Sequence, residues 1–150
     1  MKIITHSAQE TVKLGALLGK RLKAGDVIGL VGELGSGKTT LVKGIAYGLG
    51  ASEKEEISSP SFVLIKEYKA RIPVFHFDLY RLGGLKDVEQ LGIEEYLFDQ
   101  GVCLIEWAEK MKVLLPDYLQ IRIKIKGENK REFAFSANDN KRYISVLEKL

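Results

Sequence analysis

The sequence has little that would anchor it in a membrane or cross-link it. Its 150 residues include one cysteine, Cys103, so no internal disulfide can form, and a thiol in the apolar run GVCLIEW is expected to be buried as a small hydrophobe. No segment reaches the roughly 18 consecutive apolar residues of a membrane-spanning helix. The N-terminal MKIITHSAQE lacks the apolar region of a secretory signal. The expectation is a soluble cytoplasmic protein in a reducing compartment, with no membrane partner.

The chain also lacks a strong excess of one charge. Its 23 basic and 20 acidic residues give a net charge of +3, with the two signs interspersed. This balance is too mild to argue for direct nucleic-acid binding. The stretch IRIKIKGENKRE is locally basic, but alternating charge on a half-exposed strand is typical of a solvated face. There is no repeat, low-complexity tract or linker, and the length suits one well-filled core, so residues 1–150 are expected to form a single domain.

Hydrophobic periodicity predicts an α/β protein. Strands are predicted over Val27–Val31, Phe62–Tyr68, Val74–Phe77 and Val102–Ile105. Helices are predicted from the capping box Ser7–Glu10 to about Leu22, over Lys38–Leu49, around Leu85–Leu91 and Glu94–Phe98, and over Lys141–Leu150 with Ile144, Leu147 and Leu150 toward the core. The alternating LQIRIKIK and REFAF predict a C-terminal antiparallel hairpin. Buried strands interleaved with helices indicate a three-layer domain with a mixed central sheet.

The stretch GELGSGKTT, Gly32 to Thr40, fits the P-loop pattern G-x-x-x-x-G-K-[ST] of P-loop NTPases. A predicted strand enters it and a predicted helix leaves it, which turns backbone N–H groups and a helix N-terminus toward one anion. Its glycines permit positive φ and a close approach of the backbone to phosphate. Lys38 is expected to meet the β- and γ-phosphates, and the Thr39 hydroxyl to ligate Mg²⁺. The glycines of this loop are Gly32, Gly35 and Gly37. The predicted nucleotide contacts are Gly35, Ser36, Gly37, Lys38, Thr39 and Thr40.

Two carboxylates stand at the ends of predicted strands, Asp78 after VFHF and Glu106 after VCLI. Ligands of open α/β sheets bind at the carboxyl ends of the strands, so both are expected at the site. The cleaner burial pattern before Glu106 favours it as the Mg²⁺ ligand, directly or through water. Asp78 would then orient the attacking water or make a second metal–water contact, although the two assignments could be exchanged. Either carboxylate could instead cap a nearby helix.

Three other features leave two interpretations open. The loop Ser59–Ser61 follows the first crossover, where nucleotide-sensing segments often lie, but it also suits an ordinary proline-containing turn. Arg81 could steady phosphate charge, although an ion pair is favoured. Trp107 could cover the site or pack at the strand end. His6 and His76 have no companions at metal-ligand spacing and are interpreted as structural.

Other classes of P-loop protein fit less well. The segment NKRE, Asn129 to Glu132, approaches the guanine-binding N-K-x-D motif, but it sits between two alternating strands and is interpreted as the hairpin turn. A small-molecule kinase would need an arginine-bearing lid over a second substrate. Between the P-loop helix and Val102 the only arginines are Arg71 and Arg81, in a segment that also holds a predicted strand pair. A kinase and a nucleotide-dependent regulator that hardly hydrolyses remain the alternatives.

Several blocks together resemble the TsaE (YjeE) family of bacterial P-loop ATPases over nearly the whole chain. They are GELGSGKTTLVKGIAYGLG, SSPSFVLIKEY, FHFDLYRL, LGIEEYLFDQGVCLIEWAEK, and LP at Leu115 and Pro116, in this order and spacing. Members of that family take part in making the threonylcarbamoyl modification of tRNA adenosine next to the anticodon. The resemblance implies partners of the TsaD and TsaB type, whose turnover ATP binding and hydrolysis support, and only indirect contact with tRNA.

The resemblance also implies roles for individual residues, with ATP and Mg²⁺ as cofactors. It makes Lys38 and Thr39 the phosphate and metal contacts, Glu106 the second magnesium ligand, and Asp78 a residue needed for hydrolysis. The stretch SPSF, residues 59–62, becomes a switch segment, with Ser61 where the family commonly has Thr and Glu33 where it commonly has Asp. Because no segment suggests a second-substrate pocket, water is the expected acceptor, and hydrolysis is expected to be slow without partners.

Overall fold

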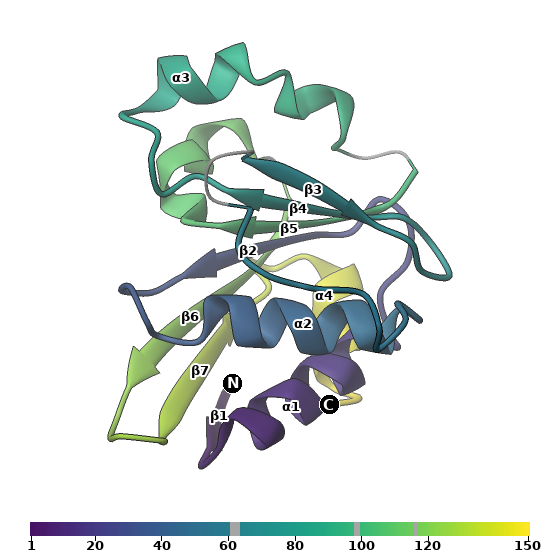
Figure 1. Cartoon of the computed structure of the whole chain (residues 1–150), viewed down its shortest axis with the longest axis vertical. Helices are drawn as coiled ribbons and strands as arrows, with labels where there is room; N and C mark the ends of the chain where they lie inside the picture. Colours follow the sequence, from purple (N-terminus) through teal and green to yellow (C-terminus); the bar gives the residue numbers. More distant parts are fainter. Residues whose placement is uncertain (61–63, 98–99, 116) are drawn as a thin grey trace.

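The computed structural model describes residues 1–60, 64–97, 100–115 and 117–150, and these contain one seven-stranded sheet. Its strands are β1 (Lys2–Thr5), β2 (Val27–Val31), β3 (Ile65–Tyr68), β4 (Val74–Asp78), β5 (Val102–Glu106), β6 (Leu119–Ile125) and β7 (Arg131–Ser136). They lie in the order β1-β7-β6-β2-β5-β4-β3 (Figure 1). The neighbours β6, β2, β5 and β4 are parallel, whereas β3, β7 and β1 pair antiparallel. The predicted mixed sheet and hairpin are therefore confirmed.

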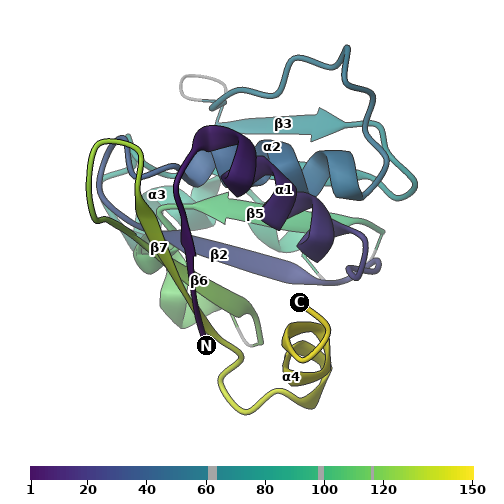
Figure 2. The ribbon, with the colours of Figure 1, turned by 90° about the horizontal axis from the view of Figure 1, so that it is seen from below.

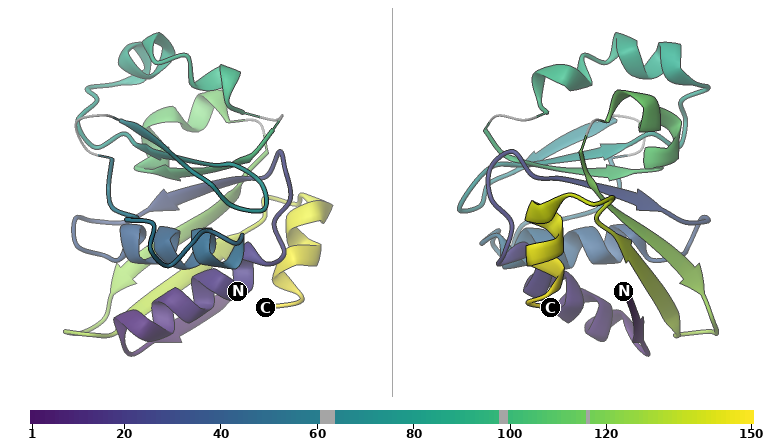
Figure 3. Two further views of the ribbon diagram at one scale, coloured as in Figure 1. Left: turned by 45° about the vertical axis from the view of Figure 1, so that its right-hand side comes forward. Right: turned by 180° about the vertical axis from the view of Figure 1, so that it is seen from behind.

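Helical segments cover the sheet on both faces. They are α1 (Ala8–Gly19), α2 (Lys38–Gly48), α3 (Leu85–Gln90), α4 (Lys141–Leu147) and the 3-10 segments η1 (Ile93–Glu95) and η2 (Ala108–Leu114). One buried hydrophobic cluster joins α1, α2 and α4 to the sheet, and a second joins α3, η1 and η2 to it. Figure 1 and Figure 3 show α3 on one side of the sheet and α1, α2 and α4 on the other. The predicted three layers follow from this arrangement.

Strands β2, β4 and β5 are buried at every position. Parallel strands read as continuous apolar runs because helices cover both of their faces. The β4–β5 register pairs Asp78 with Glu106, so the ends of these two strands lie side by side. This pairing places both predicted carboxylates at one edge of the sheet. The predicted burial of Cys103 is confirmed, because this residue of β5 is 1% exposed.

Helices α1 and α2 cross at glycines (Figure 2). A Cβ atom on Gly44 would lie 2.3 Å from the carbonyl oxygen of Val12, and one on Gly48 would lie 2.2 Å from that of Ala16. No side chain fits at such distances, so hydrogen at these positions allows the two backbones to touch. The close crossing brings the start of α1 beside the P-loop, where both line one hollow.

The N-terminal segment differs in part from the prediction. The Ser7 hydroxyl accepts the backbone N–H of Glu10 at 3.0 Å, as predicted for the cap, but the Glu10 carboxylate accepts from the backbone N–H of His6 at 2.6 Å. The helix ends at Gly19, before the predicted Leu22. Strand β1 was not predicted, because its four residues show no clear alternation and are held by pairing with β7.

The inward face of α4 is not the predicted one. Tyr143 and Val146 are buried, whereas Ile144 is 40% exposed, so the expectation for Ile144 was wrong. Leu147 and Leu150 are partly buried against the core, as expected. The Tyr143 hydroxyl accepts the backbone N–H at the start of β2 at 2.8 Å. This long-range bond sets the rotation of the helix, and helical periodicity alone does not contain it.

Some predicted boundaries lie outside the described residues, namely Phe62, Phe98 and Pro116. The described part of the predicted Phe62–Tyr68 strand begins at Ile65, and η2 was not predicted as helical. Residues 127–130 connect β6 to β7, with the backbone N–H of Lys126 bonded to the carbonyl of Lys130 at 2.9 Å, which confirms the hairpin turn at NKRE. No helix among the described residues is long and apolar enough to cross a membrane.

Candidate functional site

A pocket opens at the carboxyl ends of β2, β4 and β5, beside the N-terminus of α2. It is lined by residues 34–40, Ser59, Asp78, Tyr80, Arg81, Glu106 and Trp107. The structure thus brings together every predicted site residue that it describes, from the P-loop to Trp107. The remaining one, Ser61, lies outside the described residues. Arg81, for which an ion pair was favoured, also lines the pocket.

The P-loop glycines serve two different purposes. Gly35 and Gly37 have φ values of +75° and +106°, and a Cβ atom on either would meet nothing within 4 Å, so conformation rather than space requires glycine there. Gly32 lies outside the left-handed region, so the positive φ that was expected to require glycine does not explain this position. A Cβ atom there would lie 2.6 Å from the Ser36 hydroxyl and 2.9 Å from the carbonyl oxygen of Ile123. Close packing therefore requires Gly32.

Lys38 points back along its own loop. Its ammonium group donates to the carbonyl oxygens of Gly32 at 2.5 Å and Glu33 at 2.8 Å, and to the Ser36 hydroxyl at 3.4 Å. The Nζ atom also lies 4.4 Å from the centre of the Trp107 ring. Neutral oxygens and an aromatic face thus hold this cation at the pocket.

Two opposing effects act on the charge of Lys38. Burial lowers the pKa of the ammonium group, because the charged form loses hydration. The nearby carboxylates of Glu106, Glu109 and Asp78 act in the other direction and favour the charged form. Two of these carboxylates, Asp78 and Glu106, line the same pocket. A polyphosphate beside them would be repelled unless a cation lay between them, which is the charge arrangement of a metal–nucleotide site.

Glu106 and Thr39 supply adjacent oxygen atoms. The Thr39 hydroxyl lies 3.0 Å from Glu106 Oε1 and 3.2 Å from Oε2, and Glu106 is 3% exposed. A hydroxyl and a carboxylate are hard oxygen ligands of the kind that Mg²⁺ binds. Among the described residues, no group of three or more His, Cys, Asp and Glu side chains could hold a metal ion. The pair fits a Mg²⁺ ion whose remaining ligands are phosphate and water oxygens.

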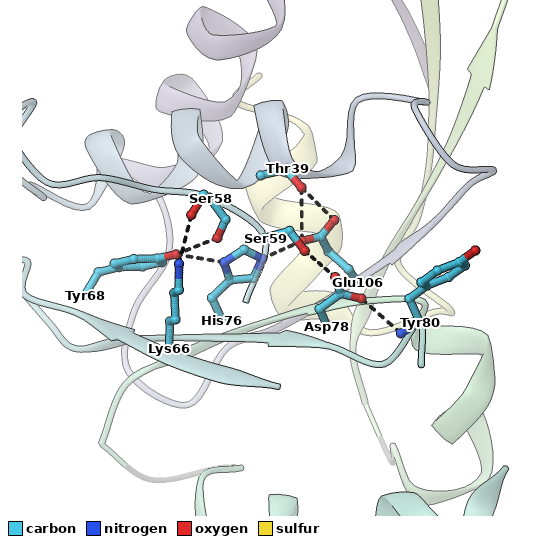
Figure 4. Close-up of polar contacts among 9 residues, drawn as sticks. All are labelled: Thr39, Ser58, Ser59, Lys66, Tyr68, His76, Asp78, Tyr80 and Glu106. Carbon is cyan, nitrogen blue, oxygen red and sulfur yellow. Dashed lines mark hydrogen bonds and ion pairs between the residues drawn. The ribbon is translucent and has the colours of Figure 1, made fainter. Parts of the chain in front are cut away.

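Asp78 is hydrogen-bonded through both of its oxygens (Figure 4). Its Oδ1 atom accepts the backbone N–H of Tyr80 at 3.0 Å, and its Oδ2 atom accepts the hydroxyl of Ser59. Asp78 is 7% exposed. The predicted switch segment therefore contacts the site through its first residue, Ser59.

His76 contacts a carboxylate of the pocket, which the sequence analysis did not foresee. It was interpreted as structural because it has no companions at metal-ligand spacing, and its Nε2 atom lies 2.6 Å from Glu106 Oε2 and its Nδ1 atom 3.0 Å from the Tyr68 hydroxyl (Figure 4). The ring is fully buried. A signal did exist, because in VFHFD the alternation puts His76 and Asp78 on one face of the strand.

Arg131, the first residue of β7, is a second missed residue. Its Nε atom donates to the carbonyl of Ser36 at 3.1 Å, and its NH2 group lies 3.5 Å from the carbonyl of Gly35. Its NH1 group donates to carbonyls of the hairpin turn, including that of Gly127 at 2.9 Å. The guanidinium group therefore ties the hairpin to the P-loop. No sequence pattern signals a contact between residues so far apart.

Comparison with known proteins agrees with this geometry. The family model described as "Threonylcarbamoyl adenosine biosynthesis protein TsaE" matches residues 5–133. The chain belongs to the TsaE family. The resemblance noted in the sequence is thus confirmed, and the P-loop NTPase fold with it. As a TsaE-family chain with this fold, it is a nucleotide-binding protein.

Individual TsaE relatives match almost their whole length. The tRNA threonylcarbamoyladenosine biosynthesis protein TsaE of Treponema pallidum (strain Nichols) is 41% identical over 133 residues, which is 88% of this chain and 97% of that protein. The protein of the same name from Bacillus subtilis (strain 168) is 43% identical over 152 residues, covering 100% of this chain and 93% of the relative. The crystal structure of Bacillus subtilis YdiB is similar with a TM-score of 0.84 at 40% identity, covering 99% of this chain and 92% of that chain.

Proposed function

We propose that this protein binds ATP with Mg²⁺ and hydrolyses it slowly, in support of threonylcarbamoyladenosine formation next to the anticodon of tRNA. The observation that carries the proposal is the convergence of Lys38, Thr39, Asp78 and Glu106 in one pocket. The pathway comes from the names of the TsaE relatives. TsaD-type and TsaB-type proteins are the proposed partners, and contact with tRNA is indirect.

The phosphates of ATP bind at the P-loop. The backbone N–H groups of residues 37–40, at the N-terminus of α2, face the phosphate oxygens, and Lys38 leaves its carbonyl partners for the β- and γ-phosphates. The terminal phosphate lies toward Glu106, so the nucleoside extends to the other side of the loop. A second hollow lies there, lined by Ser7, Ala8, Thr11, Gly35, Gly37, Thr40, Glu128, Asn129 and Arg131. This hollow is the proposed site of adenosine, and it explains why the start of α1 contacts the loop.

Thr39 and Glu106 hold Mg²⁺, which when bound neutralises charge on the phosphate oxygens. Asp78 lies beside Glu106 and accepts a hydrogen bond from the attacking water, which it thereby orients. The bonds from Ser59 and Tyr80 leave acceptor sites on this carboxylate, because an ionised carboxylate can accept about four hydrogen bonds. Hydrolysis is slow in the isolated protein because phosphoryl transfer depends on electrostatic groups that a partner protein completes. Trp107 covers the phosphate end of the pocket, and Ser61 completes the switch segment.

The alternatives predict different products. A small-molecule kinase consumes ATP only with an added acceptor and yields a phosphorylated metabolite, whereas this proposal predicts phosphate release with water as the acceptor. A regulator that only binds nucleotide shows no dependence of turnover on Asp78 or Glu106. Product analysis with the intact protein and with Asp78→Ala and Glu106→Ala separates the three functions.

Reconstitution tests the pathway directly. The protein is combined with TsaD, TsaB, ATP, threonylcarbamoyl-adenylate and tRNA, and modified tRNA is counted per transferase complex. Multiple turnovers are expected with the intact chain and none with Lys38→Ala, because that variant loses the phosphate contact. Equal turnover with Lys38→Ala would contradict the ATP-dependent role.

A further inference from the structure

A buried line of hydrogen bonds leaves the pocket on the side of β4 and β3 (Figure 4). It runs from the carboxylate of Glu106 to His76 at 2.6 Å, from His76 to the hydroxyl of Tyr68 at 3.0 Å, and from that hydroxyl to the carbonyl oxygen of Ser58 at 3.1 Å. His76, Tyr68 and Glu106 are each at most 3% exposed. No step of the proposed hydrolysis uses His76 or Tyr68.

The sheet register explains how these side chains meet. Lys66 of β3 is paired with His76 of β4, and Glu106 of β5 is paired with Asp78, two residues further along β4. Tyr68 and Glu106 are therefore diagonal neighbours of His76 on adjacent strands, within reach of long side chains on one face. The imidazole ring thus bridges three strands of the sheet.

The chemistry of the two groups decides which one donates in the hydrogen bond between His76 and Glu106. An ionised carboxylate only accepts hydrogen bonds, so the His76 nitrogen facing Glu106 carries a hydrogen atom. The other ring nitrogen faces Tyr68, whose hydroxyl is within hydrogen-bond distance of both that nitrogen and the Ser58 carbonyl. Burial raises the pKa of the Tyr68 hydroxyl to about 12, so it keeps its proton.

The outer end of the line reaches the residues that begin the predicted switch segment. Besides its contact with Tyr68, Ser58 accepts a hydrogen bond from the Lys66 ammonium group at 2.8 Å. The next residue, Ser59, donates to Asp78. Two adjacent serines are therefore each connected to a different carboxylate of the pocket, Ser59 directly and Ser58 through two buried side chains.

We propose that His76 is a positioning residue that holds the carboxylate of Glu106 toward Thr39, and that Tyr68 connects this carboxylate to the Ser58–Ser59 segment. Hydrogen bonds to metal-ligating carboxylates fix their orientation, and the loss of such a partner typically costs about 10- to 100-fold in metal affinity. The inference rests on the proposed function in one respect, the assignment of Glu106 as a Mg²⁺ ligand.

The first test separates metal binding from nucleotide binding. The affinity of a fluorescent ATP analogue is measured in EDTA and then along a Mg²⁺ titration. His76→Phe removes both bonds of the ring and is expected to raise the half-saturating Mg²⁺ concentration about 10- to 100-fold, with the affinity in EDTA unchanged within about threefold. His76→Gln keeps an amide donor that can reach Glu106 and is expected to recover part of the loss. An unchanged Mg²⁺ requirement in folded His76→Phe would overturn the positioning role.

The second test follows the segment at Ser58 by hydrogen–deuterium exchange of peptides within residues 52–60. Tyr68→Phe removes one hydroxyl and keeps the ring. Without nucleotide or metal, the variant is expected to exchange faster in this segment than the intact protein. In the intact protein, Mg²⁺ with a non-hydrolysable ATP analogue is expected to change the exchange rate of the segment, and the variant is expected to lose most of that change. Tyr118→Phe is the matched control, because Tyr118 is a buried residue whose hydroxyl donates to Gln120 at 3.2 Å, away from the pocket. A full exchange difference in Tyr68→Phe would overturn the connection, and this test does not depend on whether His76→Phe folds.

A third variant shows which hypothesis fails. Glu106→Gln is expected to raise the Mg²⁺ requirement at least as much as His76→Phe. If Glu106→Gln leaves that requirement unchanged, the metal assignment in the proposed function is wrong. If Glu106→Gln shifts it and His76→Phe does not, the proposed function stands and only the positioning role of His76 fails.

Discussion

The central strands β2, β4 and β5 and the hairpin β6–β7 belong to the same sheet but differ in how deeply their side chains are buried. The central strands are buried at every position, whereas β6 and β7 alternate between buried and more exposed residues. Helical layers on both faces account for the difference, since they shield every side chain of the central strands. Fixed, buried polar groups such as His76, Asp78 and Glu106 are therefore found in the central strands. The hairpin instead contacts the P-loop through Arg131 and lines the second hollow with Glu128, Asn129 and Arg131.

The largest expected contrast is in thiol reactivity. Burial raises the pKa of Cys103 in β5 to about 12, against about 8.5 for an exposed thiol. The thiolate is the reactive form, so below pH 9 its fraction at Cys103 is smaller by on the order of a thousandfold. A disulfide reagent at pH 8 should label Cys103 only on unfolding, but should label Lys124→Cys in a Cys103→Ser background rapidly. Rapid labelling of native Cys103 would contradict the rigid burial of β5.

The next contrast is in stability, and it uses the same substitution in both regions. Ile105→Ala in β5 removes a fully buried side chain and should lower the free energy of unfolding by about 2–5 kcal/mol. Ile125→Ala at the end of β6, where the side chain is 40% exposed, should cost less than about 1 kcal/mol. Urea denaturation measures both values. Equal losses would show that the hairpin end is packed as tightly as the centre.

A smaller effect tests the contact between Arg131 of the hairpin and the P-loop. Arg131→Met keeps the apolar stem but removes the bonds to the P-loop carbonyls, and it should weaken ATP binding about tenfold, by about 1–2 kcal/mol. Arg71→Met, at an exposed arginine in the turn between β3 and β4, is the control and should leave binding unchanged. The measurement is calorimetric titration with ATP. Wild-type affinity in Arg131→Met would mean that the bonds of Arg131 to the P-loop have no part in ATP binding.

The smallest effect is expected on the open face of the hairpin. Lys124 is exposed and lies opposite Glu132, whose carboxylate is 3.6 Å from Lys2 and 3.9 Å from Lys126. An exposed lysine near a carboxylate contributes little to stability, so Lys124→Ala should change the free energy of unfolding by no more than about 0.5 kcal/mol. Thermal unfolding at low and high salt measures the change. A loss of more than about 1 kcal/mol in the free energy of unfolding would contradict the solvent exposure of this hairpin face.

The parts of the fold that could be predicted are those with local signals. Strand β2 spans the predicted Val27–Val31, and the hairpin lies where its alternation predicted it. The P-loop pattern and the two strand-end carboxylates located the pocket, because short patterns of neighbouring residues predict glycine conformation and strand burial. The exposed Ile144 and the unpredicted strand β1 lack such a signal, since a contact with a distant strand decides each of them.

By itself, the sequence determined the order of most helices and strands, the phosphate-binding loop and the family, because each shows in short blocks of neighbouring residues. The tertiary structure alone decided which distant groups complete the pocket. His76 reaches Glu106 only through the register of β4 and β5, and Arg131 reaches the P-loop only because the hairpin lies beside it. The physical reason is that strand pairing and helix packing are settled by contacts summed over the whole core. No pattern within a few residues encodes them.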